Sequence, residues 1–114
     1  MTDDRRYLRH IMDCMVRVER YTTGGREPFF SSTLIQDAVI RNLQTLSEST
    51  LRLSPSLKSA NPSIDWRSIA GFRNVVVHNY LGIDLDIIWH IVERDLPTLK
   101  PQVAAILQQL GETP

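Results

Sequence analysis

The sequence predicts an all-α fold, an antiparallel bundle of four or five helices. Apolar residues recur at steps of three and four through most of the 114 residues, which is the spacing of one helix face. Residues typical of helix ends stand between these stretches, at Gly24-Gly25, Asn61-Pro62-Ser63 and Gly82. No segment shows convincing strand alternation. The run Val75-Val76-Val77 alone favours a strand, but it lies inside an amphipathic pattern and is expected to be helical.

The composition is that of one globular domain covering residues 1–114, with a loose tail at 111–114. The 13 basic and 13 acidic residues give a net charge of zero, so any contact with nucleic acid has to be local. The one cysteine, Cys14, cannot form an internal disulfide, and we find no secretion signal and no apolar run of about 20 residues. These features indicate a cytoplasmic protein. One cysteine and three scattered histidines argue against a metal site.

The first helix is expected to begin at Thr2, with an acidic first turn, and to end in a loop that contains Gly24-Gly25 and Pro28. Its apolar face consists of Leu8, Ile11, Met12, Met15 and Val18. Several arginines lie elsewhere on the same helix: Arg5, Arg6, Arg9, Arg17 and Arg20. They form either a solvated charged face or a strip that contacts phosphates, and the sequence leaves both interpretations open.

Thr33 and Gln36 have the spacing of a capping box that opens the second helix. One side of this helix is apolar, and another carries a polar stripe: Asp37, Arg41, Gln44 and Glu48. Two interpretations of the stripe remain open. It can be exposed to solvent with some ion pairing, or it can form a polar wall beside an active cleft.

Three further helices are expected. Ser54-Pro55 suits the start of a short helix, since serine caps well and proline is favoured at the first helical position. Asp65 is the expected cap of the third main helix, which should stop near Gly82. Asp84 is the expected cap of the fourth. Pro97 and Pro101 should kink or restart that helix, because proline lacks an N–H and clashes with the preceding turn.

The third main helix carries the candidate site. With about 100° per residue, its residues divide into two halves. One half is apolar and should enter the core: Ile69, Phe72, Val75 and Val76. The other half presents Arg73, Asn74, His78 and Tyr80 around the smaller residues Ala70 and Val77. A polar face beside modest side chains can accept another helix or a ligand.

This set of residues suits RNA cleavage without a metal ion. Arg73 offers a fixed fork of donors for a phosphate and stays charged at any working pH. His78 can move protons near neutrality, Asn74 can orient a partner group, and Tyr80 can stack, donate or be modified. In such a reaction the ribose 2′-hydroxyl is the nucleophile, and the protein supplies acid–base help and charge stabilisation.

One histidine cannot easily serve as both base and acid, so a second copy in a two-fold dimer would help. The residue pattern also allows a structural role: a buried His78 with a hydrogen bond, and Arg73 paired with Glu48 or Asp37. Outside the site, His10 and His90 are expected to be surface or interface residues. Trp66 and Trp89 are expected to anchor helix packing, and Cys14 to be a small buried filler.

Arg73, His78, Asn79 and Tyr80 resemble the R-x-x-x-x-H-x-Y signature of the HepT-like branch of the HEPN superfamily. The flanking phrases are similar too: Gln36-Asp37-Ala38-Val39-Ile40-Arg41-Asn42-Leu43, Trp66-Arg67-Ser68-Ile69-Ala70-Gly71-Phe72-Arg73-Asn74, and Gly82-Ile83-Asp84-Leu85 running into Asp95-Leu96-Pro97. The resemblance covers nearly the whole chain. Ser47-Glu48-Ser49 departs from it where Gly-Glu-Ala is usual, and Pro101 is less typical.

The resemblance implies a HEPN-like helical bundle that forms a homodimer, with the two motifs meeting in a cleft at the interface. It implies an endoribonuclease toxin with no cofactor, in which Arg73 and His78 are the catalytic pair. Asn74 fits the polar residue that is common just after the arginine in this family. Together with Asn79 and the stripe residues Asp37, Arg41 and Glu48, it is expected to be a supporting polar residue of the site. The implied partner is a minimal nucleotidyltransferase antitoxin (MntA-like), which would transfer AMP from ATP to Tyr80.

Two other functions fit the same resemblance. HEPN-like bundles also serve as non-catalytic helper or binding modules of nucleotidyltransferases, and a plain oligomerisation scaffold is a weaker alternative. The intact set of Arg73, His78 and Tyr80 favours the ribonuclease, because a helper module has no need of the pair. The zero net charge favours the helper module.

Overall fold

All the regular secondary structure in the residues that the computed structural model describes is helical. The structure describes the backbone of residues 2–78 and 84–111, and the side chains of residues 3–74 and 84–111. The elements are α1 (Thr2–Tyr21), α2 (Arg26–Ser31), α3 (Thr33–Leu51), α4 (Pro55–Ala60), α5 (Trp66–His78), α6 (Leu85–His90), the π-helical turn η1 (Ile91–Asp95) and α7 (Leu96–Gln109). None of the helices found in these ranges is long and apolar enough to cross a membrane.

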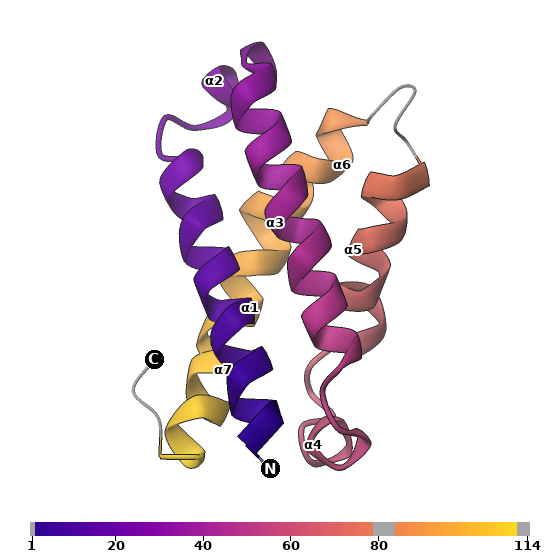
Figure 1. The fold of residues 1–114 in the computed structure, drawn as a ribbon. Coiled ribbons are helices and arrows are strands. Elements are labelled where there is room, and N and C mark those ends of the chain that lie inside the picture. The colour runs from indigo at the N-terminus through magenta and orange to yellow at the C-terminus, as the bar shows by residue number, and fades with distance from the viewer. Residues whose placement is uncertain (1, 79–83, 112–114) are drawn as a thin grey trace.

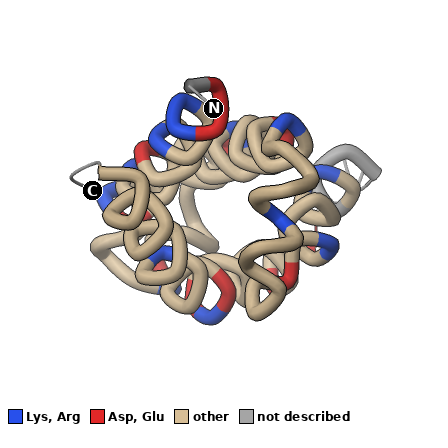
Figure 2. The backbone as a smooth tube through the Cα atoms, turned by 90° about the horizontal axis from the view of Figure 1, so that it is seen from below, with Lys and Arg blue, Asp and Glu red and all other residues tan. Residues whose placement is uncertain are grey.

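The long elements form an antiparallel bundle, as the sequence predicts. In Figure 1, α1 rises, α3 descends beside it, α5 rises again, and α6, η1 and α7 descend behind them as one rod. Helix α3 packs against both α1 and α5, and α7 packs against α1. Seen along the bundle, the helices surround a common centre, and charged residues of both signs are distributed around the outside (Figure 2). The short helices α2 and α4 lie at opposite ends of the bundle (Figure 1).

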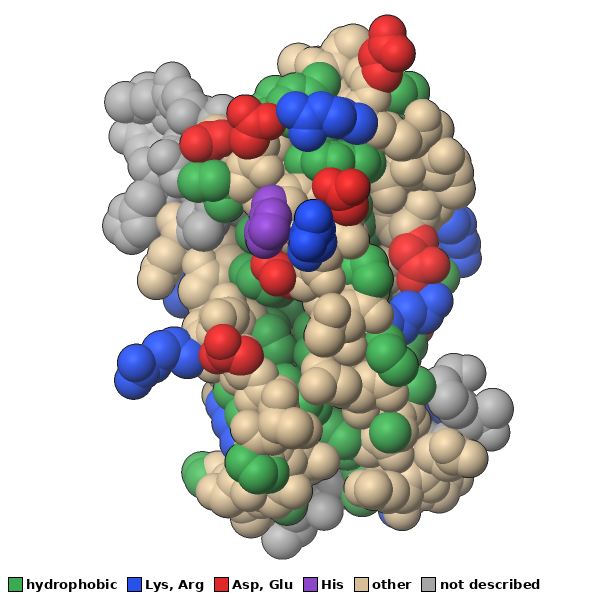
Figure 3. Space-filling model, turned by 180° about the vertical axis from the view of Figure 1, so that it is seen from behind, with side chains coloured by type: hydrophobic (Ala, Val, Ile, Leu, Met, Phe, Trp, Pro, Cys, Tyr) green, Lys and Arg blue, Asp and Glu red, His purple; other side chains and the backbone are tan. Residues whose placement is uncertain are grey.

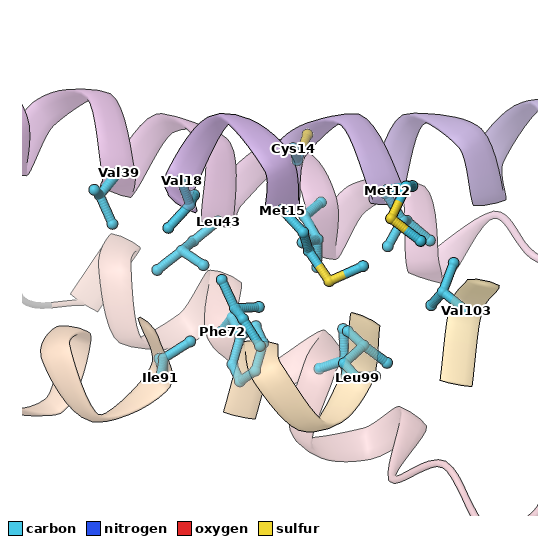
Figure 4. Close-up of a cluster of buried hydrophobic side chains, with 14 of the residues drawn as sticks. Met12, Cys14, Met15, Val18, Val39, Leu43, Phe72, Ile91, Leu99 and Val103 are labelled. Carbon is cyan, nitrogen blue, oxygen red and sulfur yellow. The ribbon is translucent and has the colours of Figure 1, made fainter. Parts of the chain in front are cut away.

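The centre of the bundle is a continuous apolar core to which every long helix contributes. Figure 4 shows Met15 of α1, Leu43 of α3, Phe72 of α5 and Leu99 of α7 meeting there. Each of these side chains is at most 4% exposed. All five apolar positions expected on α1 are buried: Leu8, Ile11, Met12, Met15 and Val18. The 3.6-residue period therefore identified the buried face of this helix correctly.

Three of the predicted helix caps are confirmed. The hydroxyl of Ser54 accepts the N–H of Leu57 at the start of α4, and Asp84 accepts two N–H groups at the start of α6. The carboxylate of Asp65 accepts the N–H of Ser68 (3.1 Å) and its hydroxyl (2.7 Å) at the start of α5. Each side chain satisfies donors that have no partner within the first helical turn.

The predicted capping box of Thr33 and Gln36 is wrong by one residue. Ser32 is the cap, since its backbone is extended and its hydroxyl accepts the N–H of Ile35. Thr33 instead takes the first helical position. The Gln36 amide donates to the carbonyls of Phe29 and Phe30, so it fastens α3 to the preceding segment.

The prediction of a loop around Pro28 is also wrong, because residues Arg26–Ser31 form the helix α2. Gly25 precedes it with a φ of 88°, a conformation that favours glycine. Pro28 lies in the first turn, where backbone N–H groups form no hydrogen bond within the helix, so proline is tolerated there. Phe29 is fully buried and its ring centroid lies 5.3 Å from that of Trp89. This contact places α2 over the end of the bundle.

The restart predicted at the prolines is confirmed at Pro97 and not at Pro101. The π-helical turn η1 widens the helix before Pro97, and the N–H of Leu96 donates to the carbonyl of Ile91. The hydroxyl of Thr98 donates to the carbonyl of Arg94 at 3.1 Å. Pro101 lies inside α7 without ending it.

Candidate functional site

Helix α5 has one buried and one exposed side where its side chains are described. Ile69 and Phe72 are 5% and 4% exposed, whereas Arg73 and Asn74 are exposed. The two sides agree with the predicted division into a core half and a polar half. The backbone of Val75-Val76-Val77 is helical, as expected.

The structure places only part of the predicted motif. His78 is the last described residue of α5, and its side chain lies outside the described part of the chain. Asn79, Tyr80 and the expected helix end at Gly82 lie outside it altogether. The loose tail expected at 111–114 falls largely outside it as well. The roles of His78, Asn79 and Tyr80 therefore remain predictions from the sequence.

Arg73 lines an open hollow between α3 and α5. The other lining residues are Glu48, Leu51 and Arg52, and the volume of the hollow is about 470 Å³. Glu48 belongs to the polar stripe of α3, so this part of the stripe does stand beside Arg73. Glu48 is also exposed to solvent, so both interpretations of the stripe stay predictions.

The other stripe residues lie away from this hollow. Asp37 and Arg41 are exposed on α3 and do not line it. At about 1.5 Å of rise per residue, Asp37 is roughly 16 Å from Glu48 along the helix axis. A role for Asp37 or Arg41 near Arg73 therefore stays a prediction from the sequence.

The ion pair that could have made Arg73 purely structural does not form among the described residues. Within that part of the chain, Arg73 forms no ion pair with Glu48 or Asp37. Its guanidinium is exposed on the wall of the hollow. An arginine in this setting can bind an anion without first breaking a pair with either carboxylate.

Helix α5 is fastened to α3 by a buried serine. Ser47 is fully buried, and its hydroxyl lies 2.9 Å from the carbonyl of Leu43 and 3.0 Å from that of Ile69. At the base of α5, the indole N–H of Trp66 lies within hydrogen-bonding distance of the carbonyls of Lys58 and Asn61. These contacts fix the axial position of α5, and with it that of Arg73, relative to the last turns of α3.

Leu51 and Arg52 are the lining residues that the sequence reasoning missed. Leu51 is 50% exposed, although it ends an amphipathic helix. A signal was present, because Arg52 continues the stripe of Arg41 and Glu48 by one more step of four residues. The sequence could not show that the last turn of α3 faces α5.

The seam between α1 and α3 holds the other histidine of interest. The Nδ1 atom of His10 lies 2.6 Å from the hydroxyl of Ser49, and Cys14 lies 3.4 Å from the hydroxyl of Thr45. His10 is half-buried rather than a plain surface residue. Cys14 is fully buried, as expected, and burial raises the pKa of its thiol. His90 is exposed, as expected.

Among the described residues, the charges outside the hollow form no basic field. The arginines of α1 are exposed on a helix that packs against α3 and α7 rather than against α5. On the face seen from behind the view of Figure 1, acidic and basic side chains stand next to one another with a histidine among them (Figure 3). Arg26 and Asp86 form an ion pair of 2.9 Å between α2 and α6. The hollow is therefore a local feature of a molecule with balanced charge.

Comparison with known proteins gives one family. The sequence model of the family described as ribonuclease HepT-like matches residues 11–106. A Caldanaerobacter subterraneus subsp. tengcongensis protein named as a candidate RNase is 31% identical over 96% of this chain and 98% of its own length. A Thermococcus cleftensis protein named as a probable ribonuclease HepT is 33% identical over 82% of this chain and 86% of its own length.

A longer relative comes from Methanocaldococcus jannaschii and is named as a gamma-glutamylcyclotransferase and candidate RNase. It is 33% identical over 96% of this chain, which spans only 50% of that protein. No solved structure matches the chain.

Proposed function

The chain belongs to the ribonuclease HepT-like family, and on that premise we propose that it is an endoribonuclease toxin that cleaves RNA without a metal ion. The observation that carries the proposal is the position of Arg73. Its side chain is exposed in a hollow beside α3, and it precedes His78 by five residues on the same helix. A polar helix face without a described ion pair to Glu48 or Asp37 is suited to a ligand.

In the proposed reaction the two motif residues have different tasks. The ribose 2′-hydroxyl attacks the adjacent phosphorus, and the bond from phosphorus to the 5′-oxygen of the next nucleotide breaks. His78 moves the protons, because an imidazole titrates near neutral pH. Arg73 binds the phosphate and stabilises the charge that grows on it in the transition state.

We further propose that the active form is a homodimer with a composite cleft. One reaction needs a base for the 2′-hydroxyl and an acid for the leaving oxygen, and each chain offers one motif histidine, His78. A two-fold axis close to the exposed side of α5 would bring two copies together. The exposed Arg73 and the half-exposed Leu51 lie on this side of the molecule.

The proposed partner is a minimal nucleotidyltransferase antitoxin that transfers AMP to Tyr80. This part rests on the resemblance of the motif. The phosphate of the added AMP would carry a negative charge near Arg73, where it would occupy the phosphate site and repel RNA. If Tyr80→Phe were still fully neutralised by the antitoxin and ATP without forming a stable complex with it, this mechanism would be wrong.

The test of the ribonuclease proposal is cleavage of total RNA in the presence of EDTA. We expect wild type to cleave and Arg73→Ala and His78→Ala to lose about 10²–10⁴-fold in rate. Arg67→Ala, on the same helix but outside the hollow, should retain the wild-type rate. Cleavage that is unchanged in His78→Ala would remove the catalytic assignment, and absence of cleavage by wild type would favour the helper module.

A further inference from the structure

The hollow that contains Arg73 contains a second arginine from another helix. Arg52 follows the last residue of α3, whereas Arg73 belongs to α5. Both side chains line the same open volume of about 470 Å³. Each guanidinium group offers a fixed fork of donors that suits a phosphate, so two of them lining one hollow can bind two phosphates of one RNA backbone.

The backbone of Arg52 is held in place although its side chain is exposed. Its N–H bonds to the carbonyls of Ser49 and Thr50 and closes the end of α3. The next residue, Leu53, is only 3% exposed and anchors the chain in the core. The side chain of Arg52 therefore projects into the hollow from a rigid base.

The charges of the hollow favour an anion. Arg52 and Arg73 contribute two positive charges and Glu48 one negative charge. Among the described residues, neither arginine forms an ion pair with Glu48. The net charge of the whole chain is zero, so this local excess is not part of a general basic field.

We propose that Arg52 is a second phosphate-binding residue of the ribonuclease site. It binds an RNA phosphate that neighbours the one bound by Arg73, and so sets the path of the RNA backbone across α3 and α5. This inference rests on the ribonuclease function proposed above. It assigns substrate binding to Arg52 and leaves the chemical step to Arg73 and His78.

A purely structural role for Arg52 makes a different prediction. A cation at the C-terminal end of a helix stabilises the helix through its dipole. Replacing Arg52 would then lower the melting temperature without a specific effect on RNA. The two roles can therefore be separated by measuring binding and thermal stability on the same variants.

The binding experiment uses Arg52→Gln, Arg52→Lys and the control Arg67→Gln, each combined with His78→Ala to prevent cleavage. Arg67 is exposed on α5, but it does not line the hollow. The probe is a fluorescein-labelled pool of random-sequence 20-nucleotide single-stranded RNA, followed by anisotropy at several salt concentrations. We expect Arg52→Gln to raise the Kd roughly tenfold, because a charge-assisted hydrogen bond is lost.

The salt dependence of binding identifies the lost contact as a phosphate contact. Each phosphate neutralised on a single strand contributes about 0.7 to the slope of log affinity against log salt. Arg52→Gln should lower this slope by about 0.7. Arg52→Lys should keep the slope because it keeps the charge, and Arg67→Gln should match the parent in both slope and Kd.

The cleavage experiment, with His78 intact, separates this inference from the proposed function. Arg52→Gln should raise KM and leave kcat near the wild-type value, whereas Arg73→Ala should lower kcat. If wild type cleaves RNA but Arg52→Gln behaves like Arg67→Gln, the role of Arg52 is overturned and the ribonuclease proposal stands. If wild type neither binds nor cleaves RNA, the proposed function is wrong and the role of Arg52 falls with it.

Discussion

Ser47 joins the two helices of the candidate site through a buried hydroxyl group. Its hydroxyl hydrogen can go to the carbonyl of Leu43 in its own helix or to that of Ile69 in α5. The neighbouring Ser49 has a similar place on the other side of α3, where it meets His10. The two serines that flank Glu48 are thus built into the helix contacts on both sides of α3.

Replacing Ser47 by alanine should lower the free energy of unfolding by about 1 kcal/mol, which is the usual net contribution of a buried hydrogen bond. Ser59→Ala is the matched control, because Ser59 is exposed on α4 and should tolerate alanine without loss. Urea unfolding followed by circular dichroism measures both. Equal stability of the two variants would show that the Ser47 hydroxyl does not hold α5.

Asp65 should make the stability of the protein depend on pH. The hydroxyl and the backbone N–H of Ser68 both donate to its carboxylate, and they lower its pKa in the folded state. A folded pKa below the unfolded value means that this stabilisation is present above about pH 4, the range of an unfolded aspartate, and is lost as the pH falls further.

Asp65→Asn removes this titration while keeping an oxygen that can cap α5. We expect the variant to be less stable than wild type at pH 7 and to lose less stability than wild type between pH 5 and pH 2, so that the urea midpoints of the two proteins converge at low pH. Comparing the two proteins cancels the contribution of the other carboxylates. A constant difference between them at all pH values would contradict the assignment.

At the scale of elements, periodicity and caps predicted most of the helices. Serine or aspartate at the caps of α4, α5 and α6 marked their starts, and the apolar period marked the buried face of α1. Helix α2 was missed because six residues are too short to show a period. The start of α3 was shifted because Ser32 and Thr33 are adjacent and both can cap.

The candidate site was predictable only in part for a physical reason. The exposure of Arg73 follows from the helical periodicity of the α5 sequence, and this periodicity is a local property. That Arg73 shares a hollow with Arg52 depends on which turn of α3 faces α5. This register is set by packing of residues distant in sequence, such as Ser47 against Ile69, and no local pattern encodes it.

The two sides of α5 should respond differently to substitution. Phe72→Ala should lower the free energy of unfolding by about 3–5 kcal/mol, because it opens a cavity in the core. Arg73→Ala should change stability by less than about 0.5 kcal/mol, because the side chain is exposed, yet it should slow cleavage by about 10²–10⁴-fold. Urea unfolding and RNA cleavage on both variants measure the contrast. A large loss of stability in Arg73→Ala would assign that residue to the scaffold.

At the scale of the whole molecule, the antiparallel elements α1, α3, α5 and the rod α6–η1–α7 form a core that needs no further partner to bury Phe72 or Leu43. The described surface has mixed charge, and the hollow lies on the outside of the bundle rather than inside it. A site on the outer face of one copy is shallow and open to water. Enclosure by a second copy would exclude water and strengthen every charge interaction in the site.

The composite site predicts how activity falls when inactive chains are added. Suppose that one active site needs the His78 side chains of both copies and that His78→Ala and wild-type chains pair at random. An equal mixture would then contain about one quarter wild-type dimers and should retain about one quarter of the activity of undiluted wild type. If each chain carried a complete site, the same mixture would retain about one half.

Light scattering during size-exclusion chromatography first establishes that the chains pair, and co-refolding prepares mixtures at several ratios. Activity that follows the square of the wild-type fraction supports the composite cleft, whereas a linear fall or a monomeric protein rules it out.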